Sequence, residues 1–235
     1  MQEIMHAAGI ILRYIVPLPV TAIIVRRFWK MPDELFRKLL HFTLMLVYIP
    51  VITAFETWWL SALFAVGILF FVCGLIAVVS RIPAFSAFVN ERRKGEYLHS
   101  SVLALVMMIA FICICWGWLG EKYLVLACIY AWGVGDGFAA LFGKRFGRHK
   151  LRLRCVDPRK TIEGSAAMFV FSALSVLGVM LARGGLTLGE CILIACAGAG
   201  VSTAVEMCTK GGFDTVTCPV AAMLVIVPLV RVLGG

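Results

Sequence analysis

The sequence contains little charge for its length. Only 15% of its 235 residues are Asp, Glu, Lys or Arg, while 62% are hydrophobic. In soluble domains about a quarter of the residues are charged and about half are apolar. Several runs of about 20 residues carry few or no charges, which is long enough for a helix to cross a hydrocarbon core roughly 30 Å thick. This composition excludes an ordinary soluble domain. It predicts an all-α integral membrane protein, a single polytopic bundle of seven or eight transmembrane helices forming one domain over residues 1–235.

Cysteine pairs with C-x-x-C spacing are also missing. The nine cysteines are scattered through the chain, and none forms a C-x-x-C pair. A zinc site or a redox-active dithiol is therefore not indicated. We interpret the cysteines as small reduced residues of apolar packing surfaces.

Acidic residues are outnumbered by basic ones, 13 to 22, but this excess does not indicate a nucleic-acid partner. Eighteen of the 22 basic residues lie in four short segments between apolar runs, namely 26–38, 81–100, 143–160 and 208–213. Cytoplasmic loops of membrane proteins are enriched in Lys and Arg, and anionic lipid attracts such segments. We therefore predict that these four segments, among them the strongly basic loop at about 143–160, face the cytoplasm.

The apolar runs predict where the spans lie. The first, residues 4–25, is the weakest, because Arg13 interrupts it and Pro17 and Pro19 would kink it. If this run does not cross the membrane, the chain has seven spans and its N-terminus is inside. Otherwise it has eight, and both termini are outside. The other predicted spans end near Phe55 and Ser80 and then cover about 101–119, 123–142, 162–182, 187–207 and 214–232.

Four acidic residues lie at or just inside the predicted cytoplasmic ends of the last four spans: Asp136, Glu163, Glu206 and Asp214. A charge at the middle of a bilayer costs on the order of 3 kcal/mol, so acids near membrane depth are usually paired, hydrated or functional. Beside a basic loop they suit a bivalent cation with bound phosphate, since Mg²⁺ prefers carboxylate and phosphate oxygens. The alternative is that the acids pair with loop cations and that the loop only determines topology.

Glycine and threonine residues flank the basic loop. Gly143 and Gly147 have the spacing of a helix-packing motif, but the two cations between them argue against a lipid-buried helix contact. A turn that exposes backbone amides to phosphate fits this composition. Thr161 and Gly164 would then begin the next helix with free amides that face an anion. Packing of small residues between helices is the alternative explanation, and a strong one in membranes.

The central motif resembles that of the polyprenol kinase family, which includes dolichol, phytol and farnesol kinases and the CTP-dependent diacylglycerol kinase of fungi. The stretch GDGFAALFGKRFG, followed by KTIEGS, is similar to the family pattern G-D-x-x-A-x-x-x-G-x-x-x-G, a gap, and K-[ST]-x-E-G-[ST]. Shorter motifs agree in order: Arg37-Lys38-x-x-His41, Arg93-Lys94-Gly95-Glu96, and Glu206 followed by Asp214-Thr215 and Pro219. Thr215 departs from the pattern, because the family commonly has Asn there.

This resemblance implies a lipid-alcohol kinase that transfers the γ-phosphate of CTP, or of another nucleoside triphosphate, to a polyprenol, an isoprenoid alcohol or diacylglycerol at the cytoplasmic membrane face. Asp136 and Glu163 would hold Mg²⁺, and Glu206 and Asp214 would assist catalysis. The expected nucleotide and phosphate contacts are Lys144, Lys150, Arg159, Lys160, Thr161, Gly143, Gly147 and Gly164, and the candidate further contacts with substrate or phosphate are Arg37, Lys38 and His41. His149 has no evident partner pattern, and the oligomeric state is open.

Two other functions are compatible with parts of the sequence. DPRKTIEG also resembles the core of phosphatidate cytidylyltransferase, which likewise uses CTP and Mg²⁺, but residues 203–219 lack its C-terminal K-D and H-G-G signatures. A small membrane transporter would also contain charged residues and broken helices. However, no string of polar residues continues through the spans, whereas a transport path needs polar access from both sides.

The basic segments make the topology testable. In a background without native cysteines, a cysteine at Gly147 or Arg148 should react with an impermeant thiol reagent only from the cytoplasmic side, and one at Gly184 only from the outside, because basic loops are retained in the cytoplasm. Labelling of intact and of opened cells measures this directly. The opposite pattern would place the basic loop on the face that has no nucleoside triphosphate, which no kinase mechanism allows.

Overall fold

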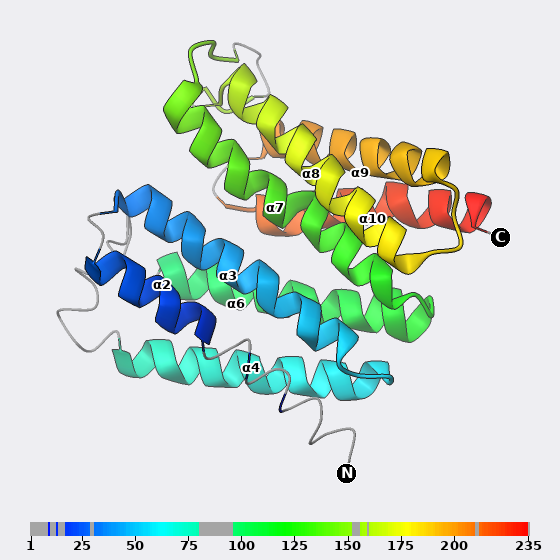
Figure 1. Cartoon of the computed structure of the whole chain (residues 1–235), viewed down its shortest axis with the longest axis horizontal. Helices are drawn as coiled ribbons and strands as arrows, with labels where there is room; N and C mark the ends of the chain where they lie inside the picture. The colour runs from blue at the N-terminus through cyan, green and yellow to red at the C-terminus, as the bar shows by residue number, and fades with distance from the viewer. Residues whose placement is uncertain are drawn as a thin grey trace. The chain divides into compact units, whose positions relative to one another are not determined.

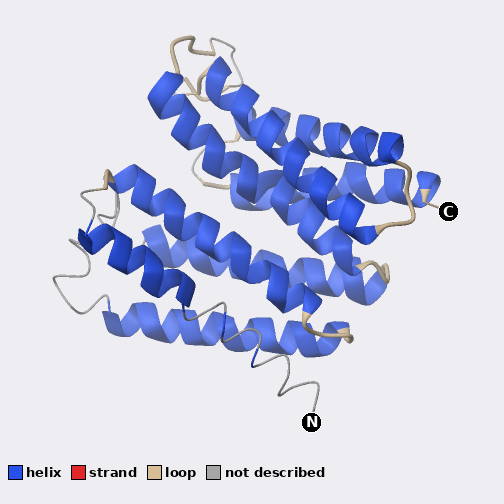
Figure 2. Ribbon diagram, viewed as in Figure 1, coloured by secondary structure: helices blue, strands red, loops and turns tan. Residues whose placement is uncertain are grey.

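Helices make up the regular secondary structure of the computed structural model, which describes residues 9, 13, 17–28, 31–79, 96–151, 156–158, 160–209 and 212–234. Within these ranges there is no strand, only an isolated antiparallel bridge between Lys150 and Thr161 (Figure 2). The predicted all-α class is therefore confirmed. The chain divides into two compact units, Met1–Gly120 and Glu121–Gly235, each described below by itself. That the whole chain forms one domain stays a prediction.

The first unit contains α2 (Pro17–Phe28), α3 (Asp33–Thr53), α4 (Trp58–Val79) and α6 (Glu96–Phe111), and α6 runs directly into a π-helix, η1 (Ile112–Trp118). Helix α3 begins as its sequence suggests. Pro32 precedes it, and Asp33 and Glu34 occupy its first turn, where carboxylates interact favourably with the positive end of the helix dipole. Deeper in the unit, the buried hydroxyl of Tyr48 donates to the carbonyl oxygen of Ala104 at 3.0 Å. This bond satisfies a polar group in otherwise apolar surroundings.

The second unit consists of α7 (Lys122–Phe146), α8 (Ile162–Arg183), α9 (Leu188–Cys208) and α10 (Asp214–Leu233). Helix α7 packs against α8, α8 against α9, α9 against α10, and α10 returns to α7. Figure 1 shows the four helices side by side, with consecutive helices running in opposite directions. The C-terminal ends of α7 and α9 therefore lie at the same end of the unit as the N-terminal ends of α8 and α10. This end carries the residues predicted to form the site.

Seven helices in the described part of the chain are long and apolar enough to cross a membrane, which confirms the predicted multi-pass class. The predicted spans 162–182, 187–207 and 214–232 agree with α8, α9 and α10 to within one residue at each end. Among the helices of the second unit, α7 has the largest buried share of its span, 67% against 44% or less for α8, α9 and α10. The predicted span 4–25 lies partly outside the described residues, and the 12 residues of α2 are too few to cross.

Close contact between α7 and α8 depends on Gly135. Its backbone lies against Met168 and Ser172 of α8, and the Ser172 hydroxyl donates to the carbonyl oxygen of Ala131 at 2.7 Å. On a neighbouring face of α7, the ring of Phe138 stacks on an α8 phenylalanine with 3.7 Å between ring centroids. Small residues let membrane helices approach until such bonds and ring contacts form, because lipid supplies no hydrophobic driving force between helices.

The opposite end of the α7–α8 pair is held by charge. Arg183, in the last turn of α8, donates through Nε and Nη2 to the two carboxylate oxygens of Glu121, at 3.0 and 2.7 Å. This two-point contact joins the residue that precedes α7 to the end of α8. A bidentate arginine–carboxylate pair has a defined geometry, so it favours one register between the two helices.

We predict that Gly135→Ala destabilises the protein. A methyl group at Gly135 would overlap the Ser172 hydroxyl and lie 2.9 Å from Met168 Cγ, so α8 would have to move away from α7. Overpacking of this kind typically costs about 1–3 kcal/mol, which thermal unfolding in detergent would measure. Gly178→Ala is the matched control, because nothing lies within 4 Å of a methyl group at that position of α8. A better helix former there should leave the unfolding temperature equal or raise it. Equal loss in both variants would contradict this account of the packing.

Candidate active site

The four predicted acids lie on four different helices of the second unit, toward the end at which α8 and α10 begin. Glu163 is in the first turn of α8 and Asp214 is the first residue of α10. Glu206 lies in the last turn of α9. Asp136 lies ten residues before the end of α7, or about 15 Å along the helix at 1.5 Å per residue. The antiparallel arrangement, which no single span encodes, is what brings acids so far apart in sequence to the same end.

Three of these acids, Asp136, Glu206 and Asp214, are linked through interactions of Cys218 and Lys160, and we call them the acid cluster. The buried thiol of Cys218, one turn into α10, interacts electrostatically with Asp214, with Asp136 and with the ammonium group of Lys160. Lys160 in turn forms an ion pair with Glu206, which is only 2% exposed. Lys160 is therefore the described cation that pairs with Glu206, and it acts on the same thiol as Asp136 and Asp214.

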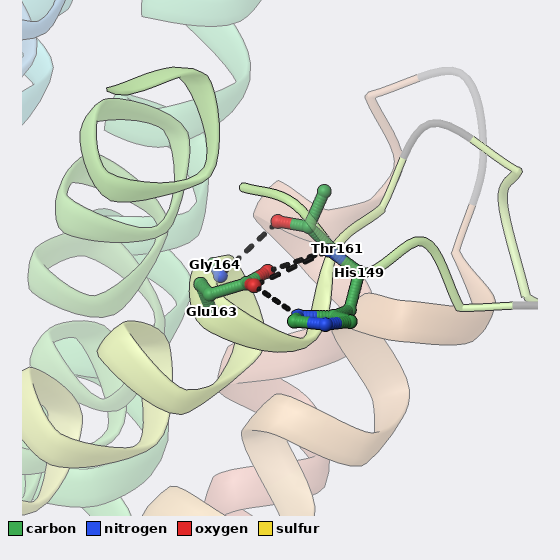
Figure 3. A network of polar contacts seen from close by, with 4 residues as sticks. All are labelled: His149, Thr161, Glu163 and Gly164. Atoms are coloured by element: carbon green, nitrogen blue, oxygen red, sulfur yellow. Dashed lines mark hydrogen bonds and ion pairs between the residues drawn. The ribbon is translucent and has the colours of Figure 1, made fainter. Parts of the chain in front are cut away.

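Glu163 has different surroundings. Its carboxylate accepts hydrogen bonds from the backbone N–H of His149, with nitrogen–oxygen distances of 3.2 and 3.3 Å, and lies 2.7 Å from Nδ1 of the His149 ring (Figure 3). A carboxylate can only accept, so Nδ1 carries the hydrogen. His149, for which the sequence suggested no partner, is therefore the main side-chain contact of a predicted metal ligand.

The two ends of the basic loop lie against each other. Lys150 and Thr161 form the antiparallel bridge, the backbone N–H of Leu151 donates to the Lys160 carbonyl oxygen at 3.1 Å, and that of Ile162 donates to the His149 carbonyl oxygen at 2.9 Å. These bonds close the loop at the point where α8 begins. Further along the loop, the backbone N–H of Asp157 donates to the carbonyl oxygen of Met207 near the end of α9, at 3.2 Å.

Thr161 caps α8. Its side-chain oxygen accepts from the backbone N–H of Gly164 at 3.2 Å, which is the usual role of a threonine just before the first helical residue (Figure 3). The helix begins at Ile162, as the sequence suggested. The amide of Gly164 is satisfied within the chain, so its predicted contact with an anion stays a prediction.

The three glycines of the motif allow close packing between α7, the loop and α8. A Cβ atom at Gly147 would overlap the Gly143 carbonyl oxygen and lie 2.8 Å from Thr161 Cγ2. A Cβ atom at Gly164 would lie 3.1 Å from the Ala139 carbonyl oxygen. Close packing against neighbouring backbone and Thr161 thus accounts for Gly147 and Gly164, while a Cβ atom at Gly143 would lie 3.2 Å from Thr161 Oγ1. Contact with phosphate at these glycines stays a prediction.

The predicted phosphate-binding cations differ in their surroundings. Lys144 lies exposed in the last turn of α7, and Lys150 is exposed on the loop. Lys160 is held by Glu206. Arg159 lies outside the described residues. Only Lys160 is therefore placed beside the acid cluster by a described contact, and phosphate binding by the other cations stays a prediction.

The predicted N-terminal contacts belong to α3 in the first unit. Arg37 forms an ion pair with Glu34 at 2.7 Å, Lys38 is buried, and the His41 ring makes an edge contact with Phe42. Of the candidate fourth motif, Arg93, Lys94 and Gly95 lie outside the described residues. A role for Arg37, Lys38 and His41 toward substrate or phosphate stays a prediction.

A preformed metal cage is absent from the described part of the chain, since no three His, Cys, Asp or Glu side chains converge there to hold an ion. The proposed pair of metal ligands, Asp136 and Glu163, also has unlike environments. Asp136 belongs to the acid cluster, and Glu163 faces the N–H groups of the loop. Magnesium binding by this pair stays a prediction. A site completed by phosphate oxygens would need only one or two of the carboxylates.

Comparison with known proteins defines the class to which these features belong. A model of the cytidylyltransferase family matches residues 7–235, so the chain belongs to that family. It is 29% identical over 225 residues to the phytol kinase of Synechocystis sp., with 93% of this chain and 89% of that protein covered. It is also 28% identical over 147 residues to a probable chloroplastic phytol kinase of Triticum aestivum, with 58% of this chain and 46% of that protein covered. No solved structure matches. The resemblance to the polyprenol kinase family is thereby confirmed.

We predict that Lys160→Ala destabilises the protein because it leaves the buried Glu206 carboxylate without its cation. Breaking a fully buried pair costs about 3–5 kcal/mol, and we expect about 2–3 kcal/mol because the Lys160 side chain is 28% exposed. Combining it with Glu206→Gln should recover most of the loss, since no buried charge then remains. Thermal unfolding in detergent measures both variants, with Lys144→Ala as the control at an exposed lysine. An equal effect of Lys144→Ala and Lys160→Ala would contradict the proposed importance of the pair.

Proposed function

We propose that this protein is a kinase that transfers the γ-phosphate of a nucleoside triphosphate, CTP in the first place, to the hydroxyl group of an isoprenoid alcohol in the membrane. The observation that carries the proposal is the gathering of Asp136, Lys160, Glu206 and Asp214 at one end of four membrane-spanning helices. The nearly full-length similarity to a phytol kinase supports the same choice. The basic segments support a cytoplasmic position for this end.

Phosphoryl transfer requires little from a protein except positioning and charge neutralisation. Lys160, and with it the exposed Lys144 and Lys150, would bind the phosphates of the nucleotide. The carboxylate of Asp136, which interacts electrostatically with the buried Cys218 thiol of α10, would contribute to one Mg²⁺ site. This donor set fits magnesium, which is commonly bound through one or two carboxylates with phosphate oxygens as further ligands. When bound, the ion would neutralise charge on the phosphate oxygens.

The remaining carboxylates suit different tasks. Glu206 is committed to Lys160, so it holds that ammonium group in place. Asp214 is the first residue of α10, where the helix dipole favours a carboxylate. It would accept the proton from the alcohol as the hydroxyl oxygen attacks the γ-phosphorus atom. The tail of the alcohol would stay in the bilayer beside the helices.

Cytidylyltransferase activity is the second candidate, because the family to which the chain belongs carries that description. In such an enzyme the lipid acceptor attacks the α-phosphorus of CTP, pyrophosphate leaves, and CMP becomes attached to the lipid. The named relatives are phytol kinases, and the chain lacks the H-G-G signature expected near residues 203–219. These two findings favour the kinase.

The products separate the two activities. Purified protein should receive CTP and Mg²⁺ together with phytol, a longer polyprenol, diacylglycerol or phosphatidate in separate reactions, and ATP should replace CTP in a parallel series. We predict CDP and a monophosphorylated isoprenoid alcohol, because the γ-phosphate is transferred. Asp136→Asn should abolish this product without lowering the unfolding temperature, since it keeps the side-chain shape and removes a charge. Stoichiometric pyrophosphate and a CDP-lipid from phosphatidate would overturn the kinase assignment.

A further inference from the structure

We propose that Glu163 and His149 form a clamp that positions the basic loop, and that Glu163 acts through this clamp and not as a metal ligand. The inference rests on the proposed function, because the loop residues it positions, Lys150 and Lys160, are those proposed to bind the nucleotide phosphates. It assigns a role to His149, which no motif includes. It also gives the glutamate of the KTIEGS motif a task different from that of Asp136.

The carboxylate of Glu163 is surrounded by hydrogen-bond donors. It accepts from the backbone N–H and from the ring Nδ1 of His149 (Figure 3). Such an arrangement stabilises an anion, as at the N-terminus of a helix. A cation beside the same oxygens would face the positive ends of these N–H dipoles. The geometry therefore favours an anchored carboxylate over one that is open to Mg²⁺.

The clamp is linked directly to the two lysines. His149 precedes Lys150, and its carbonyl oxygen accepts from the backbone N–H of Ile162, one residue before Glu163. The same pair of segments contains the Lys150–Thr161 bridge and the bond from Leu151 to the Lys160 carbonyl oxygen. Releasing the His149 ring and backbone from Glu163 would loosen these contacts. Lys150 would then lose its position relative to Lys160, whose ammonium group remains paired with Glu206.

Kinetics distinguish a clamp from a metal ligand. We expect Glu163→Ala and His149→Ala each to raise the KM for CTP about tenfold, the scale of one lost charge-assisted hydrogen bond, while kcat changes little. The double variant should resemble Glu163→Ala, because that change already removes the ring contact that His149→Ala removes. The Mg²⁺ concentration for half-maximal activity should stay unchanged. Glu163→Gln, which keeps an acceptor oxygen for His149, should be milder than Glu163→Ala.

A metal ligand predicts another pattern. Glu163→Ala would then lower kcat strongly and raise the Mg²⁺ requirement, while His149→Ala would alter neither, and this result would overturn the proposal. Glu190→Gln is the matched control, since Glu190 is also a first-turn glutamate bonded to a loop residue, Thr187, but begins α9 at the other end of the unit. It should leave the KM for CTP and the Mg²⁺ requirement at the wild-type values.

Limited trypsin digestion tests the clamp without reference to activity. In the full-length protein in detergent, without nucleotide, cleavage after Arg148 or Lys150 should become about tenfold faster in Glu163→Ala and in His149→Ala, but not in Glu190→Gln. Mass spectrometry identifies the cleaved bonds. Unchanged cleavage in both clamp variants would overturn the proposal whatever the kinetics. Faster cleavage in a protein that phosphorylates no alcohol would support the clamp and overturn the proposed function instead.

Discussion

The arrangement of the site depends on the ion pair between Lys160 and Glu206. Glu206 is almost fully buried near the end of α9, and a buried carboxylate without a partner would strongly destabilise the packing around it. Lys160 supplies the partner from the segment just before α8. The same ammonium group interacts with the Cys218 thiol, as Asp136 and Asp214 do. One cation therefore balances the buried acid of α9 and ties the basic loop to that helix.

Lys160 can reach this position because the backbone near it packs closely. A side chain at Gly143 or at Gly147 would crowd Thr161. Gly164 lies against the Ala139 carbonyl oxygen. Thr161, which follows Lys160 in the chain, then caps α8 by accepting from the backbone N–H of Gly164. In lipid, where helices gain little by merely burying apolar surface, such close contacts set the distance between helices. Packing and polar contacts at this end of the unit therefore support each other.

The proposed reaction divides its requirements between the two parts of this architecture. The apolar helices keep the protein, and with it an isoprenoid tail, in the bilayer. The charged end offers carboxylates and cations to a nucleotide that is confined to water. A phosphoryl group can pass between the two substrates only where these regions meet, and the ends of α7 to α10 are such a boundary. Cytidylyltransferases have the same need, which explains why a single family contains both activities and why the products must decide between them.

The membrane class, the limits of α8, α9 and α10, and the threonine cap before Ile162 could be predicted from the sequence. Each depends on local properties: the length of an apolar run, the proline, glycine and charged residues that bound it, and the hydroxyl at its start. The family resemblance could be recognised from the sequence for a similar reason, since GDGFAALFGKRFG and KTIEGS are contiguous motifs. The residues that pair with Glu163 and Glu206 could not be predicted from the sequence. His149 lies 14 residues before Glu163 across a loop with no periodic pattern, and Lys160 meets Glu206 only because α8 and α9 run in opposite directions. Tertiary structure alone decided that Glu163 faces the backbone N–H and ring of His149 while Glu206 pairs with Lys160, because burial and helix direction select which charges meet.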